Sequence, residues 1–122
     1  MDSKTLTALK ASIEHWRENE SVIRVAEVSV GAQGCALCFE FFQADTCAGC
    51  PVYEATGQSR CELTPYNDAY NAYDDWLDAE CLNDWLWPPA FSNHKFIVCW
   101  RARENFLLAA RDERQFLESL LP

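Results

Sequence analysis

The sequence predicts a mostly helical fold of about three main helices in a single domain that spans residues 1–122. Apolar residues recur every three or four positions in three long stretches, which is the periodicity of amphipathic helices. The apolar and aromatic contents of 49% and 13% argue against disorder, and the length suits one domain. Between the first two helical stretches, four cysteines are paired as C-x2-C, a spacing typical of metal ligands. We therefore expect a helical domain with a metal-bound segment inserted at about residues 34–64.

The first helical part is expected within residues 4–20. Its apolar residues follow one another at steps of three and four, and Asp2 or Ser3 precedes them as a candidate N-cap. The apolar face consists of Leu6, Leu9, Ile13 and Trp16. Residues 22–30 are then rich in β-branched side chains, which predicts a short strand. Because no clear partner strand follows, a small α+β fold is the alternative to the mostly helical one.

Cysteine spacing is the most specific signal in the chain. Five of the seven cysteines lie between residues 35 and 61, and the first four read C-x2-C-x8-C-x2-C. Two such pairs supply four thiolates, the set that closes a tetrahedral structural zinc site without water. The predicted ligands of a structural Zn²⁺ are Cys35, Cys38, Cys47 and Cys50. Cys61 is the alternative ligand, and an iron–sulfur cluster is the alternative group because it also uses four thiolates.

This zinc knuckle is expected to occupy residues 34–64. A short helix is predicted at residues 35–44, starting from the first cysteine pair. Residues 47–64 contain two glycines and a proline, which predicts a loop whose order depends on the metal. The remaining cysteines, Cys81 and Cys99, lie in predicted helices and are expected as small core residues.

The second and third main helices fill the predicted helical part at 64–121. Thr64 is a candidate N-cap and Pro65 suits the first helical position, whereas Pro88 must lie beyond the end of this helix. The last helix is expected to begin at Ser92. Its predicted core face consists of Phe96, Cys99, Trp100, Phe106, Leu107, Ala110, Leu117, Leu120 and Leu121.

Charge is unevenly distributed along a chain whose formal net charge is −9. Between residues 62 and 94 there are seven acidic residues and no Lys or Arg. Such a surface repels phosphates, so the expected partner is a protein with a basic surface and not nucleic acid. The predicted partner-binding residues are Asp68, Asp75, Asp78 and Glu80, with Trp85 and Trp87 as aromatic anchors. The simpler alternatives are a solvated helix face and a hydrophobic plug of the core.

No catalytic constellation emerges, and we do not expect an enzyme. The chain lacks the G-x-S-x-G, P-loop and Gly-rich dinucleotide motifs. A zinc deaminase needs H-x-E followed by P-C-x-x-C, whereas His15 begins H-W-R-E and Pro51 follows a cysteine pair. A thioredoxin-like dithiol needs a βαβ-type pattern, which the sequence does not show. His15 and His94 are therefore expected as ordinary helix residues.

No apolar run is long enough to predict a signal peptide or a membrane-spanning helix. Seven cysteines in a protein of a reducing compartment favour metal binding over disulfides. We therefore expect a cytoplasmic protein that does not associate with membranes, and the sequence does not indicate its oligomeric state.

The cysteine segments also resemble a known group of proteins, the small cysteine-rich proteins encoded by bacteriophages and prophages. The motifs that carry this resemblance are C-A-L-C (35–38), C-A-G-C-P-V (47–52), T-G (56–57), C-E-L-T-P-Y (61–66), S-I-E-H-W (12–16) and F-L-E-S-L-L-P (116–122). The resemblance implies a cysteine-ligated metal and a mobile-element context, which would place the protein in the cytoplasm of a host cell. It carries over no catalytic residue.

Three functions follow as hypotheses, and the third, a zinc or redox enzyme, has the least support from the motifs. The first is an acidic, zinc-stabilised protein-interaction module, such as a phage inhibitor of a host nucleic-acid-handling or defence protein. The alternative is a zinc-containing nucleic-acid-binding or regulatory protein that uses a basic face of the last helix. That face consists of Arg101, Arg103, Arg111 and Arg114.

Overall fold

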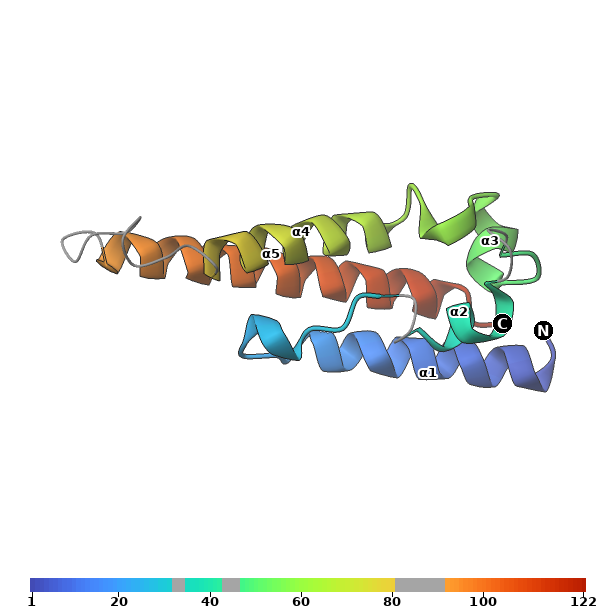
Figure 1. Cartoon of the computed structure of the whole chain (residues 1–122). Coiled ribbons are helices and arrows are strands. Elements are labelled where there is room, and N and C mark those ends of the chain that lie inside the picture. The colour runs from blue at the N-terminus through green and yellow to red at the C-terminus, as the bar shows by residue number, and fades with distance from the viewer. Residues whose placement is uncertain (32–34, 43–46, 81–91) are drawn as a thin grey trace.

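The computed structural model describes residues 1–31, 35–42, 47–80 and 92–122, with residues 92–95 described by their backbone alone. These ranges form an all-α fold with three main helices, as predicted. The helices are α1 (Ser3–Asn19), α2 (Ala36–Phe41), α3 (Pro51–Thr56), α4 (Pro65–Glu80) and α5 (Ser92–Ser119). Helix α5 lies between α1 and α4, and the short helices α2 and α3 lie at the end of the molecule near both termini (Figure 1). None of the helices in the described ranges is long and apolar enough to cross a membrane.

Two of the long helices start at the predicted capping residues. The Asp2 carboxylate accepts the backbone N–H of Thr5 at 2.7 Å and so caps α1. The Thr64 hydroxyl accepts the N–H of Tyr66 at 3.3 Å at the start of α4. The predicted end of this helix, before Pro88, lies outside the described residues.

Residues 22–30 do not form the predicted strand. They contain one turn of 3-10 helix, η1 (Val25–Glu27), and no strand occurs in the described part of the chain. The side chain of Asn19, which is buried at the end of α1, donates to the Ser29 carbonyl at 2.9 Å and accepts the Ser29 N–H at 3.2 Å. A helix side chain therefore satisfies the backbone groups that a neighbouring strand would otherwise have to satisfy.

The segment 47–64 is more regular than the predicted loop. It contains α3 and a second 3-10 turn, η3 (Ser59–Cys61). Pro51 occupies the first position of α3, and Gly57 ends the helix in the left-handed region with a φ of 73°. The Gly57 N–H donates to the carbonyl of Tyr53 at 2.7 Å. The proline and glycine that suggested a loop are thus the two boundaries of a short helix.

The core lies along α5, which packs against α1 on one side and α4 on the other. The rings of Trp76 and Phe106, both almost fully buried, pack at a tilt of 38° with their centroids 5.8 Å apart. The buried apolar residues of the three helices are Ala8, Leu9, Ile13, Trp16, Ala69, Trp76, Ala79, Phe106, Ala110 and Leu117.

The predicted core face of the last helix is wrong at both ends, because Leu121, which follows the end of α5, is also exposed. Phe96 is 70% exposed and Trp100 is 53% exposed, although both follow the helical spacing of the core residues. Helix α1 covers the C-terminal half of α5 and does not extend along its N-terminal half (Figure 1). The spacing predicted the face correctly, but it could not predict how far the covering helix reaches.

Candidate functional site

The five clustered cysteines come together at the end of the molecule that carries α2 and α3. Their positions are the start of α2 for Cys35 and Cys38, the turn before α3 for Cys47 and Cys50, and the end of η3 for Cys61. A buried serine of α1 holds the first pair in place. Ser12 accepts the N–H of Leu37 at 3.3 Å, and its hydroxyl lies 3.6 Å from the Cys35 sulfur.

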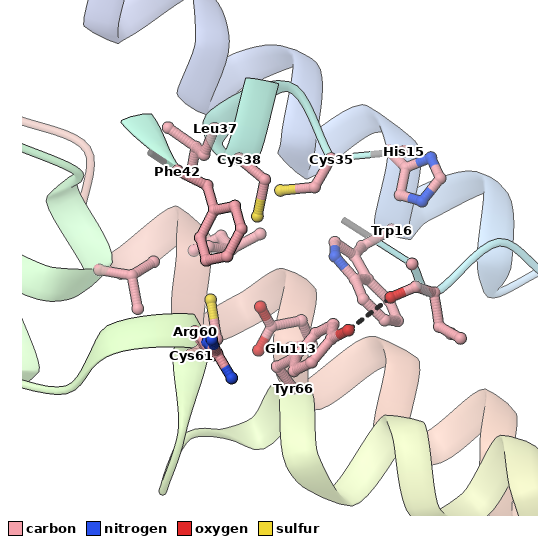
Figure 2. A pocket seen from close by; sticks show the side chains of 14 residues that line it. His15, Trp16, Cys35, Leu37, Cys38, Phe42, Arg60, Cys61, Tyr66 and Glu113 are labelled. Atoms are coloured by element: carbon pink, nitrogen blue, oxygen red, sulfur yellow. Dashed lines mark hydrogen bonds between the residues drawn. The ribbon is translucent and has the colours of Figure 1, made fainter. Parts of the chain in front are cut away.

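Three cavities adjoin these thiols, and two of them lie between several cysteines, whereas the third is an open hollow that only Cys35 of the cluster lines. The smaller of the first two, about 10 Å³, lies between Cys38, Cys47, Cys50 and Cys61. The larger of the first two, about 300 Å³, has Cys35, Cys38 and Cys61 in its wall. Figure 2 shows the sulfurs of Cys35 and Cys38 side by side, with Cys61 on the other side of the larger cavity. Cys61 therefore shares the smaller cavity with three of the predicted ligands, which favours it over Cys35 as the fourth.

The predicted zinc ligands stay a prediction, because in the described ranges no three Cys, His, Asp or Glu side chains already have the geometry of a metal site. One backbone hydrogen bond is nevertheless of the kind that a metal-bound thiolate accepts. The N–H of Arg60 donates to the sulfur of Cys47 at 3.3 Å, and such outer hydrogen bonds orient metal ligands.

The turn that carries Cys61 is strained. Arg60, Cys61 and Leu63 have φ values of 61°, 58° and 58°, in the left-handed region that costs a non-glycine residue roughly 1–2 kcal/mol. Strain of this kind persists where the surrounding structure holds the chain in place, and it clusters at functional sites. A bond from Cys61 to a metal ion would supply such a restraint.

The thiols differ in acidity because two of them are close neighbours. The sulfurs of Cys35 and Cys38 lie side by side, and their interaction lowers the pKa of Cys35 and raises the pKa of Cys38. Burial raises the pKa of Cys50 and of Cys61 above the usual value for a thiol. A bound metal ion would offset the free-energy cost of burying these thiolates, because it stabilises the deprotonated sulfur.

A buried glutamate that sequence reasoning missed also lines the larger cavity. Glu113 of α5 is 2% exposed, and its Oε2 atom has no hydrogen-bond partner in the part of the chain that the structure describes. Burial, with a further contribution from Cys35, raises the pKa of Glu113 to about 8. The signal was present in the sequence, because Glu113 falls three residues after Ala110 and four before Leu117 on the buried stripe of α5. A carboxylate at a core position requires a partner or a function.

The predicted acidic face is exposed on α4. Asp68, Asp75 and Asp78 follow at steps of seven and three residues, which places them along one side of the helix. Glu80 is exposed as well but lies toward the core side, where it accepts the indole N–H of Trp76 at 3.3 Å. None of these four carboxylates forms an ion pair with another described residue. The predicted aromatic anchors, Trp85 and Trp87, lie outside the described residues.

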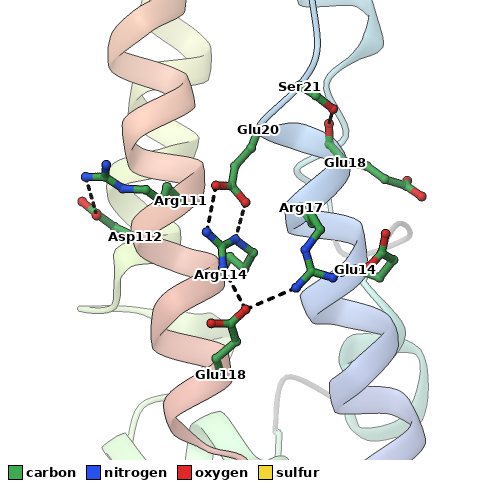
Figure 3. A network of polar contacts seen from close by, with 9 residues as sticks. All are labelled: Glu14, Arg17, Glu18, Glu20, Ser21, Arg111, Asp112, Arg114 and Glu118. Carbon is green, nitrogen blue, oxygen red and sulfur yellow. Dashed lines mark hydrogen bonds and ion pairs between the residues drawn. The ribbon is translucent and has the colours of Figure 1, made fainter.

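A polar network joins α1 to α5 and uses one of the arginines assigned to the basic face (Figure 3). Arg114 donates to both carboxylate oxygens of Glu20 and, at 2.8 Å, to Glu118. Glu118 also accepts a hydrogen bond from Arg17 of α1 at 3.4 Å. The Arg114 charge is therefore balanced by carboxylates within the molecule.

Two other arginines of that face have intramolecular partners too. Arg103 donates to the carbonyl of Val22 at 3.3 Å. A guanidinium nitrogen of Arg111 lies 3.8 Å from a carboxylate oxygen of Asp112. These contacts make the basic face weaker than the sequence suggests.

The other predicted residues have structural contacts. The Nε2 atom of half-buried His15 lies 2.7 Å from the Ser29 carbonyl oxygen. Cys99 is half-buried and its thiol donates to the Ala79 carbonyl at 3.4 Å. The side chains of Cys81 and His94 lie outside the described part of the chain.

The chemistry available at this end of the molecule is thiolate coordination next to a buried carboxyl group. A soft metal ion such as Zn²⁺ matches the thiols. Comparison with protein families, with curated proteins and with solved structures finds no match for the chain. Its own residues therefore carry the functional inference.

We expect Cys61→Ser to weaken zinc binding more than Cys35→Ser does. Loss of a direct ligand should exceed the roughly 10–100-fold cost of losing a group outside the coordination sphere. Titration with Co²⁺, followed by its thiolate absorption bands, measures both affinity and ligand number. If Cys61→Ser and the unchanged chain gave equal four-thiolate spectra, the ligands would be Cys35, Cys38, Cys47 and Cys50.

Proposed function

We propose that this protein is an acidic, zinc-stabilised protein-interaction module. The observation that carries the zinc proposal is the convergence of five thiols from α2, α3 and η3 at one end of the bundle. The two helices that flank the thiols have six residues each, which is too short for independent stability in water. A structural metal would hold this end of the molecule to the long helices.

The acidic face of α4, defined by Asp68, Asp75 and Asp78, is the proposed partner surface. These exposed carboxylates have no ion-pair partner among the described residues, whereas Arg17 and Arg114 are paired in the network between α1 and α5. Negative potential is therefore concentrated on one side of the molecule. Such a surface attracts a protein with a basic surface and accelerates its association.

The proposed partner is a host or phage protein in the cytoplasm, and the proposed role is inhibition. A row of carboxylates can occupy the basic groove that a nucleic-acid-handling or defence protein offers to phosphates. Nucleic acid is the alternative partner through the last helix. The intramolecular contacts of Arg103, Arg111 and Arg114 argue against it.

The test begins with capture from a bacterial lysate by the zinc-loaded protein, with the bound species identified and then purified. We expect a basic protein, and we expect Asp75→Lys/Asp78→Lys to slow its association by about tenfold at low salt, because exposed charges act mainly on the association rate. The helical circular dichroism should be unchanged, since exposed charges contribute little to stability. Stopped-flow or surface-plasmon measurements give the rates.

The control is Glu14→Lys/Glu18→Lys, which makes the same change in net charge on exposed residues of α1 and also removes the ion pair between Glu14 and Arg17. It should reduce the association rate much less than the α4 variant. Equal effects of the two double variants would show that net charge alone matters. Capture of nucleic acid without protein would favour the alternative partner.

A further inference from the structure

The larger cavity has the features of a small-molecule binding site. Its volume of about 300 Å³ lies at the lower end of the range for ligand pockets. Apolar side chains from all the surrounding elements form most of its wall, among them Leu37, Val52 and Leu117. An apolar chamber with a few well-placed polar groups is the usual form of such a site, and the buried one here is Glu113.

The buried polar group is the carboxyl of Glu113. It is 2% exposed, lines this cavity and leaves its Oε2 atom without a hydrogen-bond partner in the described residues. A buried carboxyl oxygen without a partner is costly, and a cation or a strong donor that entered the chamber and paired with Oε2 would remove that cost. The carboxyl group therefore selects for a positively charged nitrogen.

Aromatic rings of the same wall favour a cation as well. Trp16, Tyr66 and Phe42 line the cavity together with Glu113 (Figure 2). The Tyr66 ring is held by a hydrogen bond from its hydroxyl to the Val30 carbonyl at 2.6 Å and by an edge contact with Trp16 at 6.1 Å. Rings arranged around a cation attract it through their negative faces.

Two basic residues, His15 and Arg60, also line the cavity, and neither donates a hydrogen bond to Oε2 of Glu113. The Nε2 atom of His15 is 2.7 Å from the Ser29 carbonyl oxygen. The side chain of Arg60 is on the exposed side, where its guanidinium carbon lies 5.8 Å from the centre of the Phe42 ring. The latter contact shows that a ring of this wall already accepts a cation at the mouth of the cavity.

We propose that this cavity binds a small organic ammonium ion with an apolar body, held by the Glu113 carboxylate and the rings of Trp16, Tyr66 and Phe42. The nitrogen donates to Oε2 of Glu113, and the apolar body fills the space toward Leu37, Val52 and Leu117. This site is separate from the acidic face of α4 and does not depend on the proposed protein partner.

Three probes of similar size and different charge test the proposal on the full chain: benzylammonium, benzyl alcohol and benzoate. Isothermal titration, with protein-observed NMR to locate the binding, should show that benzylammonium binds and that the other two bind at least about tenfold more weakly. That ratio is the usual effect of a hydrogen bond to a charged group. Equal binding of benzylammonium and benzyl alcohol, or no binding of benzylammonium, would overturn the proposal.

Glu113→Gln keeps the shape of the side chain and removes its ability to carry a negative charge. We expect it to weaken benzylammonium binding about ten- to a hundredfold and to leave benzyl alcohol binding unchanged. The control Asp112→Asn removes one charge from the exposed neighbouring position and should change neither. Unchanged benzylammonium affinity in Glu113→Gln would refute the assignment, while the comparison of probes on the unmodified chain does not depend on any variant. Because Cys38 and Cys61 line this cavity as well as the proposed metal site, the zinc content of each sample is measured in parallel.

Discussion

Chelation of the proposed zinc ion is expected to unfold the cysteine-bearing end of the molecule and to abolish cooperative thermal unfolding of the whole chain. Zinc binding in zinc-finger peptides has an apparent free energy of roughly 10–16 kcal/mol, comparable with the total stability of about 5–15 kcal/mol of an ordinary domain. The segment concerned consists of six-residue helices and a turn with three left-handed non-glycine residues, so it has little stability of its own.

The measurement is circular dichroism of the reduced protein before chelation, after chelation and after zinc is restored. The signal should fall and then recover, and magnesium should not substitute because it prefers oxygen ligands. Cys99→Ser is a matched control, because this thiol lies in α5 outside the cluster and its loss should leave metal binding intact. A chelated protein with unchanged helicity and melting would contradict a structural role for the metal.

Glu113→Gln is expected to raise the free energy of unfolding relative to the unchanged chain as the pH rises. The pKa of Glu113 is raised from 4.5 to about 8 in the folded protein, mainly by burial. The folded state therefore holds a proton that the unfolded state has lost, so this residue costs stability progressively between those two values. Below about pH 4.5 both states are protonated and the cost disappears.

The difference between variant and unchanged chain should grow by roughly 2–3 kcal/mol between pH 5.5 and 7.5, at about 1.4 kcal/mol for each pH unit. The titratable groups around the carboxyl are Cys35, Cys38, Cys61, Tyr66, His15 and Arg60. They are present in both proteins, so the difference isolates Glu113. A zinc tetrathiolate has a net negative charge and would not reverse the direction. Denaturant titrations at each pH would contradict the expectation if the difference stayed constant.

Helical periodicity in the sequence was sufficient for the long helices and for their capping residues. Leu9, Ile13 and Trp16 are buried on α1 as their spacing indicates, because the apolar stripe of a long helix must face the core. The prediction of a strand at residues 22–30 was wrong for a physical reason that the residue pattern does not contain. β-Branched residues favour an extended backbone, but the partner of Ser29 is the side chain of Asn19 and not another strand.

The cysteine spacing identified the candidate site, but not its surroundings. Cys61 could be weighed only as an alternative, because its position beside Cys38, Cys47 and Cys50 depends on how η3 folds back over α2. Glu113 is 52 residues beyond Cys61 in the chain, so no local motif connects them. Its charge within the buried stripe of α5 was the one available signal. It indicates a buried carboxyl but not the cavity that it faces.

Native mass spectrometry of the purified, reduced protein tests the central claim, a metal ion held by this cysteine cluster, most directly. We predict one zinc ion in each chain, lost on mild acidification as the thiolates are protonated, and absent from a variant in which Cys47 and Cys50 are both serine. A chain that is folded and free of metal as isolated, and that takes up no zinc when zinc is supplied, would contradict the claim.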